Sequence, residues 1–144
     1  HTRLRRDWSS DVCSSDLQSE TYSALLAIRI IWTYGDGNVT KKRLKYSMRL
    51  LLDRPELADL VIPDLARWSD WSVQDRLMKL YGTKDYNNRS VKTSIIRYLI
   101  ASTKDLPEDK NAKLPAHVLK GRQLVDAIKK KDPKTYRIAT RTFF

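Results

Sequence analysis

The sequence has little of the chemistry that most metal and catalytic sites need. Its 144 residues include one cysteine, two histidines and four glycines. The cysteine is Cys13, so residues 18–144 can form no disulfide and offer no thiolate to a metal or a nucleophilic mechanism. In that range His117 is the single histidine, and one imidazole cannot build a multi-histidine metal site. We therefore predict no metal and no cofactor.

Other patterns are also missing. No segment alternates apolar and polar residues over a useful length, so strands are not expected. The longest apolar stretch, Ala24 to Trp32, is interrupted by Arg29 and is too short to span a membrane. A Gly-rich phosphate loop is absent, and no evident Ser-His-Asp arrangement can be assembled. These absences predict a non-enzymatic chain without a membrane span in this segment.

The segment HTRLRRDWSSDVCSSDL, His1 to Leu17, has neither helical nor strand periodicity. It resembles a translated sequencing adaptor of the kind that contaminates metagenomic gene models. We interpret it as an artefactual, disordered leader and exclude it from the fold prediction. The natural N-terminus is then missing, and no compartment is predicted. Three arginines and three aspartates cancel within the leader, so residues 18–144 keep the net charge of +11.

Helical spacing of apolar residues runs through the rest of the chain. A first helix is predicted over Thr21 to Trp32, with apolar residues on several faces, as is typical of a helix covered by its neighbours. A second is predicted from Thr40 to Leu52. Its inner face should carry Leu44, Met48 and Leu51.

Capping signals mark the next helices. Asp53 can cap a helix that opens with Pro55, and Pro63 should kink that helix or begin a new turn. Ser72 with Asp75 resembles a capping box for a fourth helix. Asn38-Val39-Thr40 and Asn88-Arg89-Ser90 match the N-glycosylation pattern, but both lie where helices begin, so capping is the simpler interpretation.

The C-terminal half continues the pattern. A fifth helix is predicted from Ser90 to Ala101, followed by a polar loop at residues 104–113. Pro115 can open a sixth helix, and Asp132-Pro133 should stop it and start a short terminal helix. The residues predicted inward on the fifth and sixth helices are Val91, Ile95, Tyr98, Leu99, Leu114, Val118, Gly121, Val125 and Ile128. The terminal helix should carry Tyr136, Ala139 and Phe143.

The stretch VIPDLARWSDWSVQDRLMKLYG, Val61 to Gly82, resembles a HEAT repeat, and Val91-Lys92 is a weaker second match. The residues that carry the resemblance are Pro63, Leu65, Trp68, Asp70, Val73, Gln74, Leu77 and Leu80. The resemblance implies an all-α fold in which antiparallel helix pairs stack as a short HEAT-like α-solenoid of about six to seven helices. Residues 18–103 would form the repeats, and the basic helices of 114–144 would pack on them. A truncated array exposes an unpaired end, expected here around Thr21 to Trp32.

Basic and aromatic residues are the candidate interaction surface. Basic residues crowd the second helix and accumulate again near the C-terminus, and this excess could attract phosphates or an acidic protein, or simply be solvated surface. Trp32, Trp68 and Trp71 are interpreted mainly as packing residues, with Trp71, in a turn, the most exposed. The predicted surface residues are Lys41, Lys42, Lys45, Arg49, Trp71, Lys120, Lys129 and Lys130.

The sequence leaves three functions open. The first is a non-catalytic protein-interaction or scaffold module, part of a larger protein, whose partner is another protein or the missing remainder of its own chain. The second is a basic HEAT-like protein that binds nucleic acid. The third, an alkylpurine DNA glycosylase-like enzyme, rests on a loose similarity of composition at Trp68, Asp70, Trp71 and Arg97.

Overall fold

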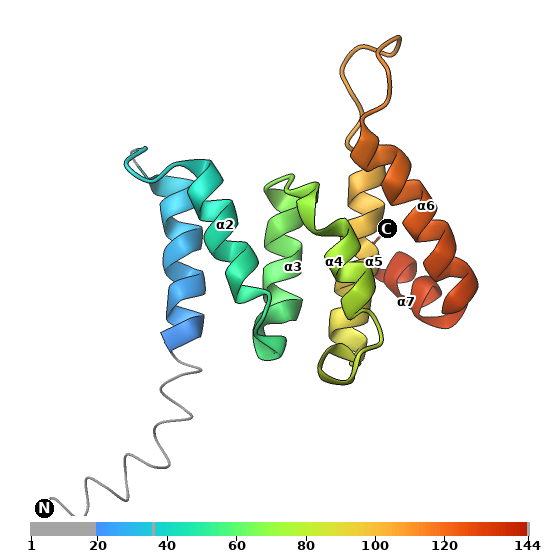
Figure 1. Cartoon of the computed structure of the whole chain (residues 1–144), viewed down its shortest axis with the longest axis horizontal. Helices are drawn as coiled ribbons and strands as arrows, with labels where there is room; N and C mark the ends of the chain where they lie inside the picture. Colours follow the sequence, from blue (N-terminus) through green and yellow to red (C-terminus); the bar gives the residue numbers. More distant parts are fainter. Residues whose placement is uncertain (1–19, 36, 144) are drawn as a thin grey trace, which may run out of the picture. The chain divides into compact units, whose positions relative to one another are not determined.

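The computed structural model describes residues 20–35 and 37–143. The predicted leader lies outside these residues, and so does the side chain of Phe143. The described residues form seven α-helices and no strand, which confirms the all-α prediction and the expected number of helices (Figure 1). The chain divides into two compact units, one ending at Leu51 and the other beginning at Leu52.

The first unit contains a helix of residues 20–34, a turn, and α2 (Lys41–Leu51). Gly37 has a φ of 92° in the turn, a left-handed conformation that glycine adopts without steric cost. Thr40 caps α2, because its Oγ1 accepts a hydrogen bond from the backbone N–H of Arg43 at 3.2 Å. Leu25, Leu44 and Met48 are its buried apolar side chains, whereas Leu51 is only half-buried.

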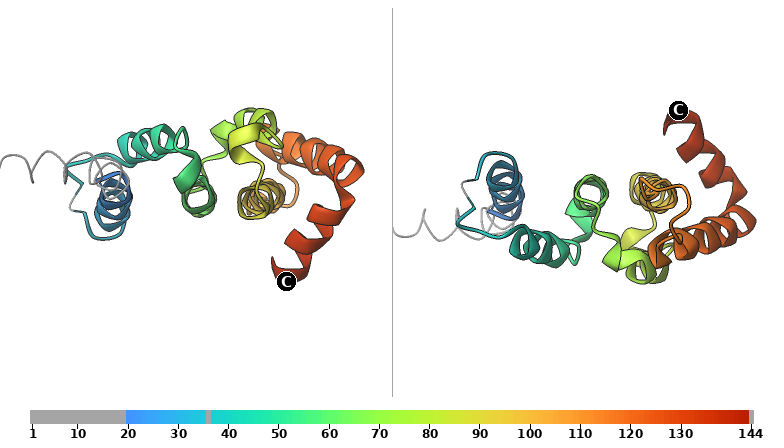
Figure 2. Two further views of the ribbon diagram at one scale, coloured as in Figure 1. Left: turned by 90° about the horizontal axis from the view of Figure 1, so that it is seen from below. Right: turned by 90° about the horizontal axis from the view of Figure 1, so that it is seen from above.

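The second unit contains five α-helices. They are α3 (Ala58–Arg67), α4 (Gln74–Leu80), α5 (Arg89–Thr103), α6 (Ala116–Lys131) and α7 (Pro133–Phe143). The 3-10 turns η1 (Pro55–Leu57), η2 (Trp71–Val73) and η3 (Lys84–Tyr86) precede α3, α4 and α5. Consecutive helices from α3 to α6 run antiparallel (Figure 1). The two end-on views place α3, α5 and α7 in one layer of the unit, with α4 and α6 in the other (Figure 2).

α5 is the central helix of this unit and contacts α3, α4, α6 and α7. Its predicted inward residues, Val91, Ile95, Tyr98 and Leu99, are all buried. Ile96 and Ile100 are buried as well, because neighbours cover α5 on more than one side. Gly121 of α6 permits a close approach to α5, since a Cβ at this position would lie 2.3 Å from the Oγ of Ser102.

Two predicted helix caps are wrong. Arg54, not Asp53, precedes η1, and it makes no side-chain capping hydrogen bond. Asp53 instead forms an ion pair with Arg76, a partner too distant in sequence for local spacing to reveal. Before α4 the cap is Asp70 rather than Ser72, because Asp70 Oδ1 accepts hydrogen bonds from the Ser72 backbone N–H at 3.4 Å and hydroxyl at 2.6 Å.

Two further local signals, at Asn88 and Pro63, had different outcomes. Asn88 caps α5 as expected, with its Oδ1 accepting a hydrogen bond from the backbone N–H of Val91 at 2.8 Å. Pro63 neither ends α3 nor starts a new helix, since α3 continues through it to Arg67.

Residues 104–115 connect α5 to α6 as a loop that extends away from the helices (Figure 1). Among the described residues, no helix has the length and apolar character that crossing a membrane requires.

Candidate interaction surfaces

A row of large apolar side chains is exposed along the helix of residues 20–34. Tyr22, Leu26, Ile30 and Tyr34 form this apolar row, and their exposed fractions are 45, 37, 59 and 81%. Residues four apart lie on the same side of a helix, so the four side chains follow one another along its length. Ile31 beside them is 38% exposed. The expectation that neighbours cover this helix is therefore wrong, and the exposed row lies in the segment where an unpaired face was expected.

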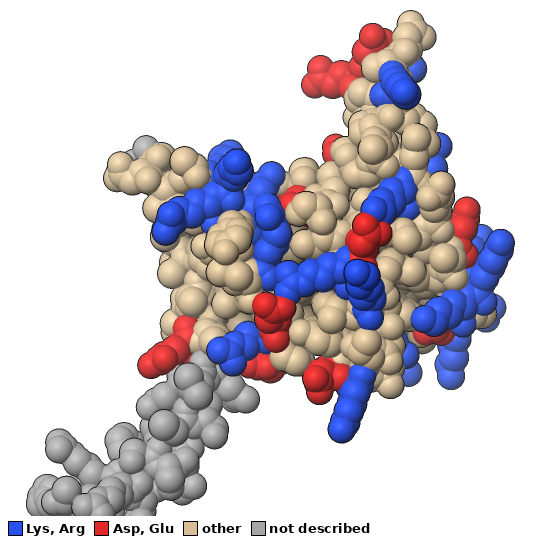
Figure 3. All heavy atoms as spheres, viewed as in Figure 1, with Lys and Arg blue, Asp and Glu red and all other residues tan. Residues whose placement is uncertain are grey.

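The second surface is basic and lies on α2, which carries five cationic side chains and no acidic one. Figure 3 shows lysine and arginine side chains gathered over this helix. A groove of about 480 Å³ opens on it; we call it the α2 groove, and it is lined by Asn38, Thr40, Lys42, Arg43, Tyr46 and Arg49.

The α2 groove divides the basic residues that the sequence singled out. It brings together Lys42 and Arg49, whereas the Lys41 ammonium lies 5.1 Å from the centroid of the Trp32 ring, and Lys45 is half-buried outside the groove. Sequence reasoning left Arg43 out of the predicted surface and did not single out Tyr46. The helical spacing could have indicated Tyr46, because it lies four residues after Lys42 and three before Arg49.

Trp71 is a junction residue rather than an open recognition surface. It is half-buried, its ring packs edge-on against Tyr98 at a centroid distance of 5.2 Å, and it stacks with His117 at 6.0 Å. Its Nε1–H donates a hydrogen bond to Asp105 Oδ2 at 2.8 Å. Trp68 is buried, with 8% of its surface exposed.

The base of the loop at residues 104–115 is held together by one carboxylate. Asp105 Oδ2 lies 2.8 Å from His117 Nε2 and accepts the hydrogen bond from Trp71. Gln74 strengthens the junction, because its Nε2 donates to Ser102 Oγ at 3.0 Å and to the His117 carbonyl at 2.9 Å. The two ends of the loop are therefore joined to the turn between α3 and α4.

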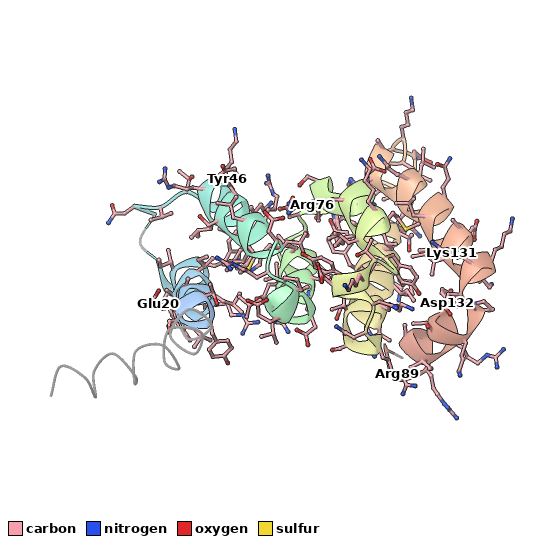
Figure 4. The ribbon with its side chains drawn as sticks, turned by 60° about the horizontal axis from the view of Figure 1, so that its bottom comes forward. Glu20, Tyr46, Arg76, Arg89, Lys131 and Asp132 are labelled. Carbon is pink, nitrogen blue, oxygen red and sulfur yellow. The ribbon has the colours of Figure 1, made fainter. Side chains whose placement is uncertain are left out.

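The predicted basic residues of α6 fall into different environments. Lys120 forms an ion pair with Asp75, and Lys129 lies 5.7 Å from the centroid of the Tyr136 ring. Lys130 is exposed. Lys131, next to Asp132 where α6 meets α7 (Figure 4), is 5.9 Å from the Tyr81 ring. These lysines therefore have separate local surroundings within the second unit.

Tyr81 and Asp132 form the main electrostatically perturbed pair of this unit. The Tyr81 hydroxyl donates to Asp132 Oδ2 at 2.8 Å. Burial, with the adjacent carboxylate, raises the pKa of Tyr81 far above its ordinary value. Hydrogen bonding from Thr135 lowers the pKa of Asp132, and the bond from Tyr81 acts in the same direction. These shifts have local structural causes at a helix junction.

The residues named in the glycosylase comparison do not line one shared groove in the described part of the chain. The described residues contain no group of three or more side chains suited to a metal ion. Asp70, which the glycosylase comparison would make catalytic, is 5% exposed and caps η2 through Ser72. Arg97 lines a separate groove of about 390 Å³ between α3 and α5, and Asp70 is not part of that lining. The geometry gives base excision no support.

Comparison of the chain with models of protein families, with curated proteins and with solved structures yields no match.

Proposed function

We propose that this chain is a non-catalytic protein-interaction module of the HEAT-like class. In this proposal the apolar row on the helix of residues 20–34 binds an amphipathic helix of a protein partner. The observation that carries the proposal is the exposure of Tyr22, Leu26, Ile30 and Tyr34 along one side of one helix. Contiguous exposed apolar patches commonly mark protein contact sites.

The dimensions of the apolar row suit a helical partner. From Tyr22 to Tyr34 an α-helix rises about 18 Å, which is roughly three turns. Helices that dock into apolar surfaces present anchors at the first, fourth, fifth and eighth positions, a span of about 10 Å that fits within this length. Burying one aliphatic or aromatic side chain contributes about 1.5–3 kcal/mol. Several half-exposed anchors therefore provide enough apolar surface for a specific contact.

Charge defines the flanks of this partner helix. The helix of residues 20–34 carries only Glu20 and Arg29 as charged residues, whereas α2 in the same unit is strongly basic. Acidic residues beside the apolar stripe of the partner would be attracted to this unit, and opposite charges accelerate association. We therefore assign the partner an apolar stripe with acidic flanks.

The HEAT-like assignment is supported by the second unit. Its helices from α3 to α6 run antiparallel, and α3 to α7 alternate between two layers, as expected when helix pairs stack (Figures 1 and 2). Stacked helix pairs bind through extended helical surfaces, and this function needs no catalytic residues. An interaction module accounts for these features without additional chemistry.

The test measures binding of a labelled peptide designed as an amphipathic helix, with leucines on one face and glutamates beside them, by fluorescence anisotropy. We expect it to bind the full chain more tightly than a peptide of scrambled order. Ile30→Glu should weaken binding by at least about tenfold, because it places a charge in the contact. Leu119→Glu is the matched control, since Leu119 is 45% exposed on α6, and it should leave affinity unchanged.

Two results would reject the proposal. One is equal loss of affinity in Ile30→Glu and Leu119→Glu at unchanged helical content. The other is self-association of the chain that Ile30→Glu abolishes, which would make a second copy the occupant of the apolar row.

A further inference from the structure

The α2 groove combines cations with an aromatic ring, and the proposed protein contact draws only on the charge. Its lining includes three cations, Lys42, Arg43 and Arg49, and no carboxylate. Lys42, Tyr46 and Arg49 lie four and then three residues apart, so they follow one face of α2 over about 10 Å. Figure 4 labels Tyr46 on this helix. A volume of about 480 Å³ lies within the range of sites for small ligands.

Tyr46 is the distinctive member of the groove. Its side chain is 57% exposed although it lies among cations, and it leaves an aromatic surface accessible to a ligand. Every nucleobase has a flat face that can stack on such a ring, while the adjacent cations attract the backbone phosphates. An acidic peptide would engage the cations but would leave the ring without a specific role.

We infer that the α2 groove binds single-stranded nucleic acid, with a base stacked on Tyr46 and phosphates held by Lys42, Arg43 and Arg49. A single strand is favoured over a duplex because base pairs in a duplex are already stacked on one another, so their faces are not available to Tyr46. Binding of this kind tolerates many sequences, since stacking and charge do not read base edges. The site is separate from the apolar row, which does not include any residue of the groove.

Binding of a labelled twelve-nucleotide oligothymidylate to the full chain, by fluorescence anisotropy across a salt series, tests this site. Oligouridylate of equal length distinguishes DNA from RNA, and an abasic twelve-mer supplies the same phosphates without bases. We expect the base-bearing strands to bind more tightly than the abasic one. Tyr46→Ala should lower their affinity at least about fivefold, towards that of the abasic strand, whereas Tyr46→Phe should retain most of it.

The charge contribution is tested by Lys42→Gln combined with Arg43→Gln. Each lost phosphate contact on a single strand reduces the slope of log affinity against log salt by about 0.7. The slope measured for this double variant should therefore be smaller in magnitude by about 1.4. The same change at Arg122 and Lys130, which are exposed on α6, removes equal charge away from the groove and should have much less effect. Tyr34→Ala removes an exposed ring from the apolar row and should leave nucleic-acid binding unchanged.

Three results would overturn the inference. The first is equal affinity for thymidylate and abasic strands. The second is an equal loss from the α2 and α6 double variants, which would indicate diffuse attraction to a basic protein. The third is poly-glutamate binding as tight as the oligonucleotides and equally sensitive to Tyr46→Ala. These oligonucleotide measurements do not involve the designed peptide. Their failure would therefore leave the apolar-row proposal standing, and failure of the peptide to bind would leave the nucleic-acid inference standing.

Discussion

The hydroxyl of Tyr81, at the end of α4, donates a hydrogen bond of 2.8 Å to the carboxylate of Asp132, at the junction of α6 and α7. The other oxygen of Asp132 accepts a hydrogen bond from the backbone N–H of Thr135 at 3.2 Å, in the first turn of α7. One carboxylate thereby connects three helices of the second unit.

This carboxylate predicts a loss of stability in acid. Hydrogen bonds from Thr135 and Tyr81 lower the pKa of Asp132 in the folded state. Because the pKa of Asp132 is lower in the folded than in the unfolded chain, the ionised carboxylate stabilises the fold above the pKa of an unfolded aspartate, about 3.9. This stabilisation is lost as the pH falls through the folded pKa. Asp132→Asn should therefore make unfolding less pH-dependent below about pH 4. Urea unfolding at pH 7 and pH 3 measures this difference.

The control for Asp132 is Asp126→Asn, because Asp126 is exposed on the same α6. If both variants show the same pH dependence as the unmodified chain, Asp132 does not carry the acid sensitivity assigned to it.

Gly121→Ala should destabilise the chain even though alanine favours helix. Ala gains about 1 kcal/mol over Gly in a helix interior. The added Cβ would, however, lie 2.3 Å from Ser102 Oγ and 3.2 Å from Thr103 Cγ2, so the packing of α5 against α6 must shift. Overpacking of this kind costs about 1–3 kcal/mol. We expect Gly121→Ala to lower the urea concentration at the midpoint of unfolding. Adding Ser102→Ala removes the crowded hydroxyl, so the double variant should recover part of this loss. A rise in the midpoint for Gly121→Ala alone would contradict the close contact.

Asp105→Ala should loosen the loop at residues 104–115. The substitution removes the acceptor of the Trp71 hydrogen bond and the partner of His117, so the base of the loop loses both connections. Trypsin should then cleave faster at Lys110 and Lys113, and mass spectrometry of the early fragments measures the rate. Asp109→Ala is the control, because the Asp109 carboxylate accepts its hydrogen bond from within the loop, from the backbone N–H of Asn111. Equal acceleration by the two variants would show that Asp105 does not secure the loop.

Local signals predicted the helices well where the cap and the helix are neighbours in sequence. Asn88 caps α5 as expected, and the inward residues of α5 follow helical spacing. The predictions at Asp53 and Ser72 were wrong for a common reason. Several residues in each turn could serve as the cap, and spacing alone does not choose among them: Asp70 caps in place of Ser72, and Asp53 pairs with Arg76.

The candidate surfaces were predicted less completely. The basic character of α2 is visible in the sequence, and helical spacing could also have indicated Tyr46 among the cations. The role of Trp71 could not be predicted in this way, because Asp105 and His117 lie far along the chain and meet it only after α6 has packed on α5.

By itself, the sequence determined that the chain is helical, where most helices lie, and that the protein is strongly basic. These properties depend on the spacing of apolar residues within a few turns and on composition, and both are local. Only the tertiary structure decided that the apolar row is exposed and that α5 is enclosed. Both helices are rich in apolar residues, and which of their faces is buried depends on neighbouring helices that periodicity alone does not specify.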